Sequence, residues 1–516
     1  MKNKKGFTLI ELLAVIIILA VIALIATPIV LNVIDNARKS ANKDSAYGLL
    51  DSDKLYYMES LLDESKSLSG NLIDKINVSG RKPDDSGTVY INNKGEIALA
   101  VVYDKVCYKK EYGDTDLIES SDIENCKVSE NIVYKDSILN GADPELKDNL
   151  VPVVINNDGT VKKADLSKEW YNYTNKTWAN AVLLNDNDTY KVGDTIIEDA
   201  IKAYYVWIPR YKYQIFYDGT NATSKQLINI TFENKDTAKS NGTTKDSWLT
   251  HPAFTFGDDE LNGIWVGKFE LTGDTTNPTI KPNVKSLRNQ NVSTLFATTQ
   301  KLSENSAMLK NIEWGAVTYL TTSIYGQGLT EVRINNSSTY ITGCAASVEN
   351  GASYNECEKT YNTTIGYLAS TTGNISGIYD MSGCSWEYVM GVLEDSLNSN
   401  TPSSGQTSSF NSGFSGKNLN DGTATTGVAF PNSKYYDIYK YGTTYNDGIA
   451  YSRGHLGDAT TETKGWNENR AYFVRSNSPW FKRGGSYGAG VSAGIFAFDS
   501  YYGSAHSDNS TRAVLR

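Results

Sequence analysis

Hydrophobic positions dominate one uninterrupted stretch near the start of the chain. No charged side chain occurs from Leu12 to Ile34, and Asp35 ends the stretch. At ~1.5 Å rise per residue, a helix of this length measures roughly 35 Å, enough to cross the apolar core of a bilayer. Lysines among the first five residues favour a cytoplasmic N-terminus. The pattern therefore predicts a single transmembrane helix over 12–34, with the rest of the chain on the extracytoplasmic side.

The pattern changes after this stretch, first to an amphipathic helix and then to strand-like alternation. Up to about Ser65, Ala46, Leu50, Tyr57 and Leu61 fall near one helical face, with charges between them. From Thr88 to Cys107 the order is apolar run, Asn-Asn-Lys-Gly turn, apolar run, which is typical of a hairpin. Residues 7–130 are therefore expected to form one small domain, a long helix packed on an antiparallel sheet.

The remaining pattern predicts mostly strands. Within 131–200, the apolar run Leu150–Ile155 precedes a turn at Asn156–Gly159, and tryptophans follow, so we expect a connector that forms its own small β-module. From 201 to 516, short strand-like runs alternate with long polar loops, which predicts a large β-rich domain. The expected fold class is α+β.

Composition narrows the function. A chain of 516 residues is too long for one domain. The net charge of −10, with no basic stripe, argues against nucleic acid as a partner. The 34 tyrosines and 42 glycines suit an exported β-rich protein with polar recognition surfaces. Composition alone identifies no ligand.

The cysteines suggest local disulfides. Of the five, Cys107 lies close to Cys126 and Cys344 close to Cys357, so two bridges are expected after export, with buried reduced thiols as the alternative. Cys384 is left over. No pair has zinc-site spacing, and none of the three histidines lies in a metal or nucleophile motif.

The N-terminus resembles the class III signal of type IV prepilins and pseudopilins. The matching features are the basic leader, Gly6, the block Phe7-Thr8-Leu9-Ile10-Glu11, and Pro28 within the apolar helix. The resemblance implies that a prepilin peptidase removes leader residues 1–6 by cutting between Gly6 and Phe7, and methylates the new amino group of Phe7. It further implies that Glu11 neutralises the N-terminal ammonium of a neighbouring subunit when helices pack into a filament.

An ordinary secretory signal is the alternative for this segment. Such a signal has a shorter apolar region and a small-residue cleavage site, which this chain lacks. A plain membrane anchor gives no reason for Glu11, because a carboxylate at the apolar edge of a helix is costly. The features favour the prepilin interpretation, and a long helix on a small sheet is the pilin plan.

Three C-terminal segments resemble the formylglycine-generating-enzyme (sulfatase-modifying factor) superfamily, which has a variant of the C-type lectin fold. They are Gly377–Tyr388, Lys482–Tyr487 and Thr511–Leu515, and Glu313–Val317 resembles a family helix. Tyr388, Tyr487 and Thr511 depart from the family pattern. The resemblance implies a lectin-like domain over 201–516.

The catalytic part of that resemblance fails. The oxidases of the superfamily bind copper through a cysteine pair in the segment that here runs from Arg483 to Arg512, and this segment contains no cysteine. Thiol-dependent metal chemistry requires those sulfur atoms. The chain is therefore expected not to be an enzyme, and no organic cofactor is expected.

The resemblance also implies a calcium site. The family positions correspond here to Asp380, Gly383, Ser385 and Glu387. Oxygen ligands that include two carboxylates suit calcium. The alternative is that Glu387 only holds a loop by hydrogen bonds. Cys384 replaces the asparagine of the family motif.

The segment Gly488–Ser510 resembles the variable region of retroelement-diversified proteins, which use this fold as a ligand-binding scaffold. It lacks Lys, Glu, Gln, Met and Trp, the residues that adenine-directed mutagenesis of asparagine codons does not produce. Tyrosine, serine, glycine and asparagine also make an effective general binding surface. The alternative is a polar loop of a relative that is not diversified. The expected ligand-binding positions are Tyr487 and eight positions that are expected to be exposed: Asp499, Ser500, Tyr501, Tyr502, Ser504, His506, Ser507 and Asp508.

Together these features predict a single-pass membrane protein with an extracytoplasmic head, found at the cell surface or in a pilus after processing. A head this large is too bulky for a major pilin, so a minor or tip subunit that binds a protein or glycan is expected. The expected partners are a prepilin peptidase, other pilin subunits and the cytoplasmic membrane. The alternatives are a pseudopilin of a type II secretion or DNA-uptake system, and a pilin-anchored extracellular enzyme.

Overall fold

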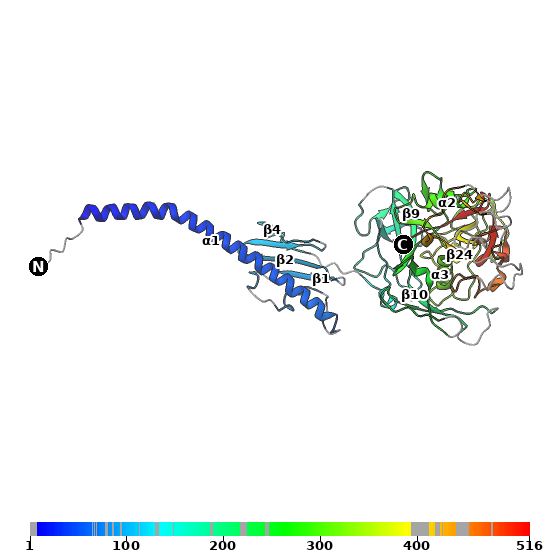
Figure 1. Ribbon diagram of the computed structural model, residues 1–516, viewed down its shortest axis with the longest axis horizontal. Helices are drawn as coiled ribbons and strands as arrows, with labels where there is room; N and C mark the ends of the chain where they lie inside the picture. The colour runs from blue at the N-terminus through cyan, green and yellow to red at the C-terminus, as the bar shows by residue number, and fades with distance from the viewer. Residues whose placement is uncertain are drawn as a thin grey trace. The chain divides into compact units, whose positions relative to one another are not determined.

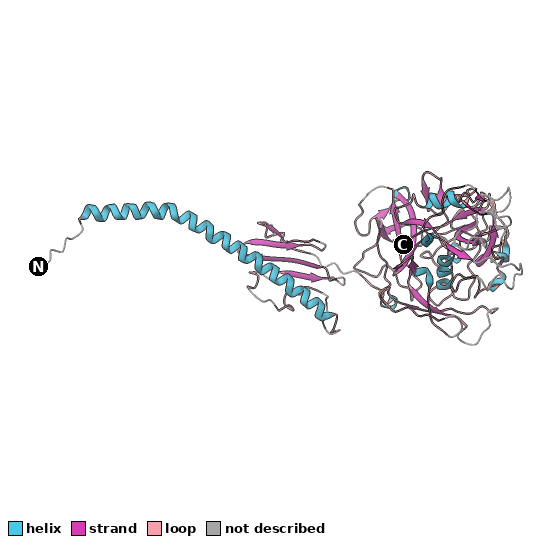
Figure 2. Cartoon of the chain, viewed as in Figure 1, coloured by secondary structure: helices cyan, strands magenta, loops and turns pink. Residues whose placement is uncertain are grey.

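The computed structural model divides the chain into two compact units, Met1–Val133 and Tyr134–Arg516 (Figure 1). Figure 2 shows one long helix in the first unit and mostly strands in the second, so the α+β class is confirmed. The structure describes residues 8–516 except 64–65, 67, 69, 78–80, 85–86, 93–94, 113, 129–133, 148, 186–188, 217–223, 243–246, 394–411, 418–423, 426, 440–453 and 476–477. Gly6 and Phe7 of the predicted processing site lie outside the described residues.

The first unit consists of one helix and one sheet. Helix α1 (Leu9–Ser60) joins the predicted apolar and amphipathic segments into one element and contains Pro28. It is the one helix in the described part of the chain that is long and apolar enough to cross a membrane. The antiparallel sheet has the order β1-β2-β3-β4 and confirms the predicted hairpin, with strands β1 (Thr88–Ile91), β2 (Ile97–Tyr103), β3 (Val106–Lys110) and β4 (Ile118–Ser120).

The second half of α1 packs on this sheet (Figure 1). Its buried stripe contains Ala46, Leu49 and Leu50, which have i, i+3, i+4 spacing and contact the apolar side chains of β1 and β2. Leu61, which the sequence placed on the same face, is 66% exposed because α1 has ended at Ser60.

One buried residue of α1, Asp53, has a side chain that would be charged at neutral pH if it were exposed to water. Asp53 continues the stripe one turn beyond Leu49, it is 0% exposed, and neither carboxyl oxygen has a hydrogen-bond partner among the described residues. Burial raises the pKa of Asp53 to about 8, since a buried carboxyl group favours its neutral form.

This burial makes the stability of the first unit dependent on pH. The unfolded carboxyl group has the ordinary pKa of 3.8 and the folded one about 8, so unfolding releases a proton between these values and stability falls as pH rises through them. We expect Asp53→Asn to raise the unfolding free energy at pH 8 by on the order of 4 kcal/mol and to change it little at pH 4. Urea unfolding followed by circular dichroism measures this. The matched control is Asp51→Asn, whose side chain is 75% exposed, and an equal effect of both variants would contradict the assignment.

The second unit is built on an eight-stranded sheet. Its strands follow the order β18-β28-β15-β9-β7-β5-β6-β8, and every neighbouring pair is antiparallel. The strands are β5 (Leu150–Ile155), β6 (Val161–Lys163), β7 (Asn180–Leu184), β8 (Thr195–Ile196), β9 (Ile201–Pro209), β15 (Gly263–Gly267), β18 (Ser306–Met308) and β28 (Ala513–Leu515).

The predicted connector module over 131–200 is wrong. The expected strand Leu150–Ile155 and its turn exist, but β5, β6, β7 and β8 pair with β9 in the same sheet rather than forming a module of their own. The reason is that β7 lies between β5 and β9, so the apolar residues of this region share one continuous core with the rest of the unit. Residues 134–516 therefore form one compact unit.

A second, five-stranded sheet lies next to the C-terminal segments. Strand β21 (Trp386–Leu393) is its central strand. It pairs antiparallel with β25 (Trp480–Gly484), and it pairs in parallel with β24 (Asp437–Tyr439) and with β27 (Asn509–Thr511). Strand β26 (Gly494–Tyr501) pairs with β25. Smaller sheets join β10 (Tyr211–Gln214), β11 (Asn229–Phe232) and β12 (Leu249–Thr250); β13 (Thr255–Phe256) and β14 (Asp259–Glu260); β16 (Thr272–Gly273) and β17 (Pro278–Thr279); β19 (Cys344–Ala345) and β20 (Lys359–Thr360); and β22 (Gly416–Lys417) and β23 (Ala424–Thr425).

The helices of this unit are short. They are α2 (Val292–Thr299) and α3 (Asn311–Thr321), and 3₁₀ turns at Ser137–Leu139, Glu198–Ala200, Pro252–Phe254, Gly366–Ala369, Ser433–Tyr435, Trp466–Glu468 and Gly490–Ser492. Every residue of α3 is buried. Trp314 of α3 donates a hydrogen bond to the carbonyl oxygen of Ile495 in β26, so α3 lies beneath the five-stranded sheet.

Candidate functional site

The start of α1 carries the predicted assembly residue. The Thr8 hydroxyl accepts a hydrogen bond from the Glu11 amide, and Glu11 Oε2 accepts one from the Thr8 amide at 2.8 Å. This reciprocal pair is a capping box, which satisfies amide groups that have no partner within the helix. In a single subunit, Glu11 therefore stabilises its own helix end and remains exposed.

The first half of α1 presents apolar side chains on all sides. Leu9 is 84% exposed, Leu24 79% and Ile10 77%. A contiguous apolar surface of this size requires cover, which a bilayer or the helices of other subunits can provide. The first half of α1 therefore has the surface of a segment that lies in a bilayer or packs among other helices.

The second candidate site lies on one face of the five-stranded sheet. Lys482 of β25 pairs with Asp499 of β26 and Tyr388 of β21. Cross-strand partners and residues two apart in a strand share a face, so Trp386, Lys482, Asp499 and Tyr501 lie on the same side. We call these four residues, with the adjacent His506, the C-terminal face.

A lysine lies at the centre of the C-terminal face. Lys482 Nζ is 4.5 Å from the ring centroid of Trp386, 5.0 Å from that of Tyr501, and 3.7 Å from Asp499 Oδ2. Two rings and a carboxylate stabilise the ammonium. Burial nevertheless lowers the pKa of Lys482 to about 8, partly offset by Asp499.

The predicted ligand-binding residues lie together but differ in exposure. Ser507 is exposed, and a half-buried group follows, namely Tyr487, Tyr501, Tyr502, Ser504, His506 and Asp508. Asp499 and Ser500 are both 8% exposed, so their expected exposure is wrong. The physical reason is ion pairing, since Asp499 Oδ2 lies 2.7 Å from Arg470 Nε and also pairs with Lys482, which lets a carboxylate be buried in β26.

Tyrosines line the accessible part of this region. The Tyr501 ring lies 4.9 Å from that of Tyr502 and 5.1 Å from His506. The Tyr487 ring meets Tyr340 edge-on at 4.9 Å, and the Arg288 guanidinium stacks 3.6 Å above the Tyr340 ring. Aromatic side chains held in this way lose little conformational entropy on binding a partner.

His506 contacts the Asp508 carboxylate through Nδ1. Burial, together with the nearby Lys482 ammonium, lowers the pKa of His506 below its ordinary value. The imidazole is therefore neutral at pH 7 and accepts or donates hydrogen bonds without adding charge.

The residues of the predicted calcium set are hydrogen-bonded to other protein groups. Glu387 receives hydrogen bonds from Arg512 on both oxygens, at 2.6 and 3.1 Å, and Asp380 Oδ1 accepts from Asn335 and from the Gly343 amide. Ser385 donates its amide to Glu270 at 2.8 Å, and the Gly383 amide donates to Gly484. Among the described residues no group of three or more His, Cys, Asp and Glu side chains is placed to hold a metal ion, but the predicted set contains only two such side chains. The Arg512 contacts are those expected under the alternative, in which Glu387 only holds a loop by hydrogen bonds, and calcium binding stays a prediction.

Arg512 is the residue that sequence reasoning missed. Its guanidinium is 0% exposed and also donates to the carbonyl oxygens of Gly267 and Tyr379, so it joins the two sheets. Burial raises the pKa of Glu387 to about 7, and Arg512 opposes that shift. Arg512 lies in the closing segment Thr511–Leu515, whose resemblance to the family could have pointed to it. Only the fold shows that the carboxylate facing this arginine is that of Glu387.

Both predicted disulfides are confirmed. Cys107 is bonded to Cys126, and Cys344 to Cys357. Cys384 is a buried free thiol, and burial beside Glu270 raises the pKa of this thiol well above its ordinary value. A thiol held in its neutral form is a poor nucleophile.

These features make the first unit similar to a pilin- or pseudopilin-type subunit. It has an apolar helix that follows a basic segment, begins with a capping box that includes Glu11, and packs on a small sheet. Residues 1–27 match the family model described as the prokaryotic N-terminal methylation motif. No curated protein matches the chain. The motif supports processing by a prepilin peptidase, assembly with other pilins, membrane anchoring and a pilus or surface location.

Proposed function

We propose that this chain is a minor or tip subunit of a type IV pilus-like filament, and that its second unit binds a protein or glycan at the cell surface without catalysing a reaction. The observation that carries the proposal is the joining of a pilin-type unit to a separate unit of residues 134–516 that presents clustered tyrosines. The head lies on the extracytoplasmic side in this proposal.

The proposed fold of the head is a C-type-lectin-like variant of the formylglycine-generating-enzyme type. The arrangement of the three resembling segments supports it. Strand β21, from the first segment, pairs directly with β25, from the second, and with β27, at the start of the third. Segments separated by about a hundred residues along the chain are thus hydrogen-bonded neighbours in one sheet.

Two features support the absence of catalysis. Asp380 and Glu387, two of the acidic residues that an enzyme could use in this region, are at most 1% exposed and are hydrogen-bonded to protein groups. The segment between Arg483 and Arg512 contains no cysteine. A substrate needs a reactive group that it can reach.

The full-length chain, purified in nanodiscs and labelled, would be tested on glycan and protein arrays. We expect Tyr487→Ala and Tyr502→Ala to reduce the signal on any bound spot roughly ten-fold or more, because aromatic residues carry much of a typical interface's affinity. The matched control is Tyr190→Ala, a half-buried tyrosine elsewhere in the head, which should keep wild-type binding. An absence of binding on every array, or equal loss in the control, would contradict the proposal.

Diversification of Gly488–Ser510 by a retroelement is a further part of the proposal. Its support is the amino-acid composition of this segment, which contains no Lys, Glu, Gln, Met or Trp. Substitutions confined to residues 487–508 among isolates, together with a neighbouring reverse transcriptase gene and template repeat, are the expected findings. A pseudopilin of a secretion or DNA-uptake system would instead keep this segment constant and would fail in transport when the head is removed.

A further inference from the structure

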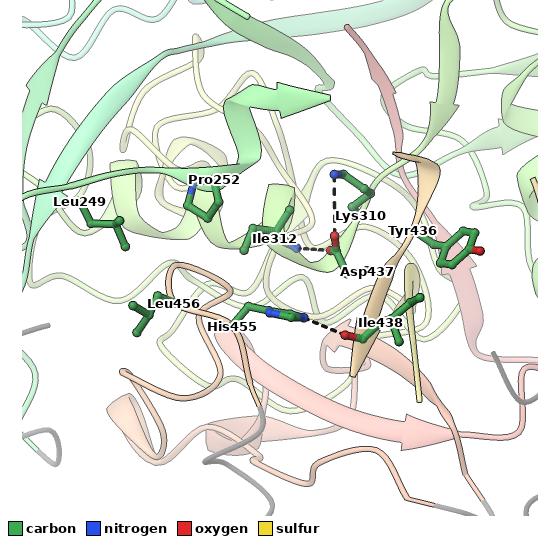
Figure 3. A pocket seen from close by; sticks show the side chains of 9 residues that line it. All are labelled: Leu249, Pro252, Lys310, Ile312, Tyr436, Asp437, Ile438, His455 and Leu456. Carbon is green, nitrogen blue, oxygen red and sulfur yellow. Dashed lines mark hydrogen bonds and ion pairs between the residues drawn. The ribbon is translucent and has the colours of Figure 1, made fainter. Parts of the chain in front are cut away.

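A pocket lies in the second unit and shares no residue with the C-terminal face (Figure 3). Its volume is about 630 Å³, within the range of small-molecule sites. Its walls come from β12, the turn at Pro252–Phe254, the start of α3, β24 and the loop after Gly454. The lining residues are Leu249, Pro252, Lys310, Ile312, Tyr436, Asp437, Ile438, His455 and Leu456.

Most of the pocket wall is apolar. Leu249, Pro252, Ile312, Ile438 and Leu456 supply aliphatic surface from five separate segments. Such a wall favours an apolar ligand body through the hydrophobic effect. Figure 3 shows the polar groups of Lys310 and Asp437 facing each other within this apolar surround.

The polar pair has unused hydrogen-bonding capacity. Lys310 is 6% exposed, and its Nζ lies 3.7 Å from Asp437 Oδ1, too far for a hydrogen bond. Asp437 Oδ2 accepts from the Ile312 amide at the start of α3, at 2.8 Å. Among the described residues, Nζ has no hydrogen-bond acceptor and Oδ1 no donor, so a free donor and a free acceptor face each other.

The charges around the pocket balance. The Lys310 ammonium is opposed by the Asp437 carboxylate, and the nearby Glu313 carboxylate is paired with Arg516. His455 lies at the pocket edge, where its Nε2–H donates to the Ile438 carbonyl oxygen at 2.9 Å. A ligand with net charge would add an unpaired ion to this balanced, mostly buried set, and burying an unpaired ion is costly.

We propose that this pocket binds a small neutral molecule that has an apolar body and a carboxamide-like head. The head's carbonyl oxygen accepts from Lys310 Nζ, and its N–H donates to Asp437 Oδ1. The apolar body lies against Ile312 and Leu456. This site is additional to the proposed ligand-binding surface and does not depend on it.

The test uses three probes that share one apolar body: 4-methylpentanamide, 4-methylpentanoate and 4-methylpentylamine. Binding to the full-length chain in nanodiscs is measured by saturation-transfer-difference NMR at pH 7, with empty nanodiscs as the blank. We expect the amide to bind in the millimolar range and each ion to bind at least ten-fold more weakly. Tighter binding of either ion, equal binding of all three, or no binding of any would overturn the proposal.

Two pairs of variants locate the binding. Leu456→Trp fills the pocket without touching its polar pair and should abolish binding of the amide. Leu329→Trp, at a leucine outside the pocket that is 54% exposed, should keep it. Lys310→Met with Asp437→Asn should remove the preference for the amide over the ions. Thermal unfolding checks that each variant is folded, and unchanged binding in a folded Leu456→Trp variant would overturn the proposal.

Discussion

Arg512→Met is expected to lower the unfolding free energy of the second unit by about 3–5 kcal/mol, the usual cost of removing one partner of a buried ion pair. Glu387 and Arg512 are both 0% exposed, so water cannot replace the lost guanidinium. The loss is compounded by neighbouring carboxyl groups. Arg512 also opposes the burial-raised pKa of Asp380, and Glu270 lies near enough for its charge to act on Arg512.

Urea unfolding of the full-length chain, followed by tryptophan fluorescence, measures this loss, because all nine tryptophans lie in the second unit. Lys168→Met is the matched control. It breaks an ion pair with Asp165 in which the lysine side chain is 78% exposed, and we expect a change within about 0.5 kcal/mol.

A double variant separates the unpaired charge from the lost packing. Glu387→Met combined with Arg512→Met removes both charges and should recover part of the stability lost in the single variant. The recovery stays incomplete because the carbonyl oxygens of Gly267 and Tyr379 lose their donor. A single variant that unfolds within 1 kcal/mol of wild type would show that Arg512 does not hold the two sheets together.

Local pattern was sufficient to predict the first unit. The apolar run, the Asn-Asn-Lys-Gly turn and the cysteine spacing depend on neighbours in sequence, and α1, the β1–β2 hairpin and the Cys107–Cys126 bridge follow from them. Asp53 is the exception. The periodicity of apolar residues does not predict the burial of an aspartate on the apolar face of a helix. Only the packing of the whole helix on the sheet reveals its burial.

The second unit is less predictable because its contacts are long-range. The final strand β28 inserts between β15 and β18, and no local signal in residues 134–200 indicates that their strands join the same sheet. The candidate site shows the same limit. Its residues were located by resemblance, but the burial of Asp499 was not predicted. The ion pair that allows this burial is made with Arg470, which lies in a different segment of the chain. The pocket around Lys310 and Asp437 combines residues from five elements and has no motif.

Glu11→Gln is expected to reduce incorporation of the chain into filaments at least ten-fold while leaving it processed and membrane-anchored. In the proposed assembly, the Glu11 carboxylate faces the N-terminal ammonium of a neighbour's Phe7 within packed apolar helices. Without the carboxylate that ammonium is unpaired in a medium of low polarity, where an unpaired charge is strongly unfavourable. In a single subunit Glu11 also caps α1, but a lost cap costs only about 1 kcal/mol, so capping alone would not prevent assembly.

The measurement compares the amount of chain in sheared surface filaments with the amount that stays in the membrane, by immunoblot against the second unit. Glu59→Gln is the matched control, because Glu59 is an acid of the same helix beyond the apolar segment and pairs with Lys66. Mass spectrometry of the N-terminus establishes that both variants begin at a methylated Phe7, and Gly6→Ala supplies the unprocessed reference. If Glu11→Gln enters filaments as efficiently as Glu59→Gln, Glu11 serves only as a helix cap. In that case the exposed apolar surface of α1 would have to drive assembly without a charge pair.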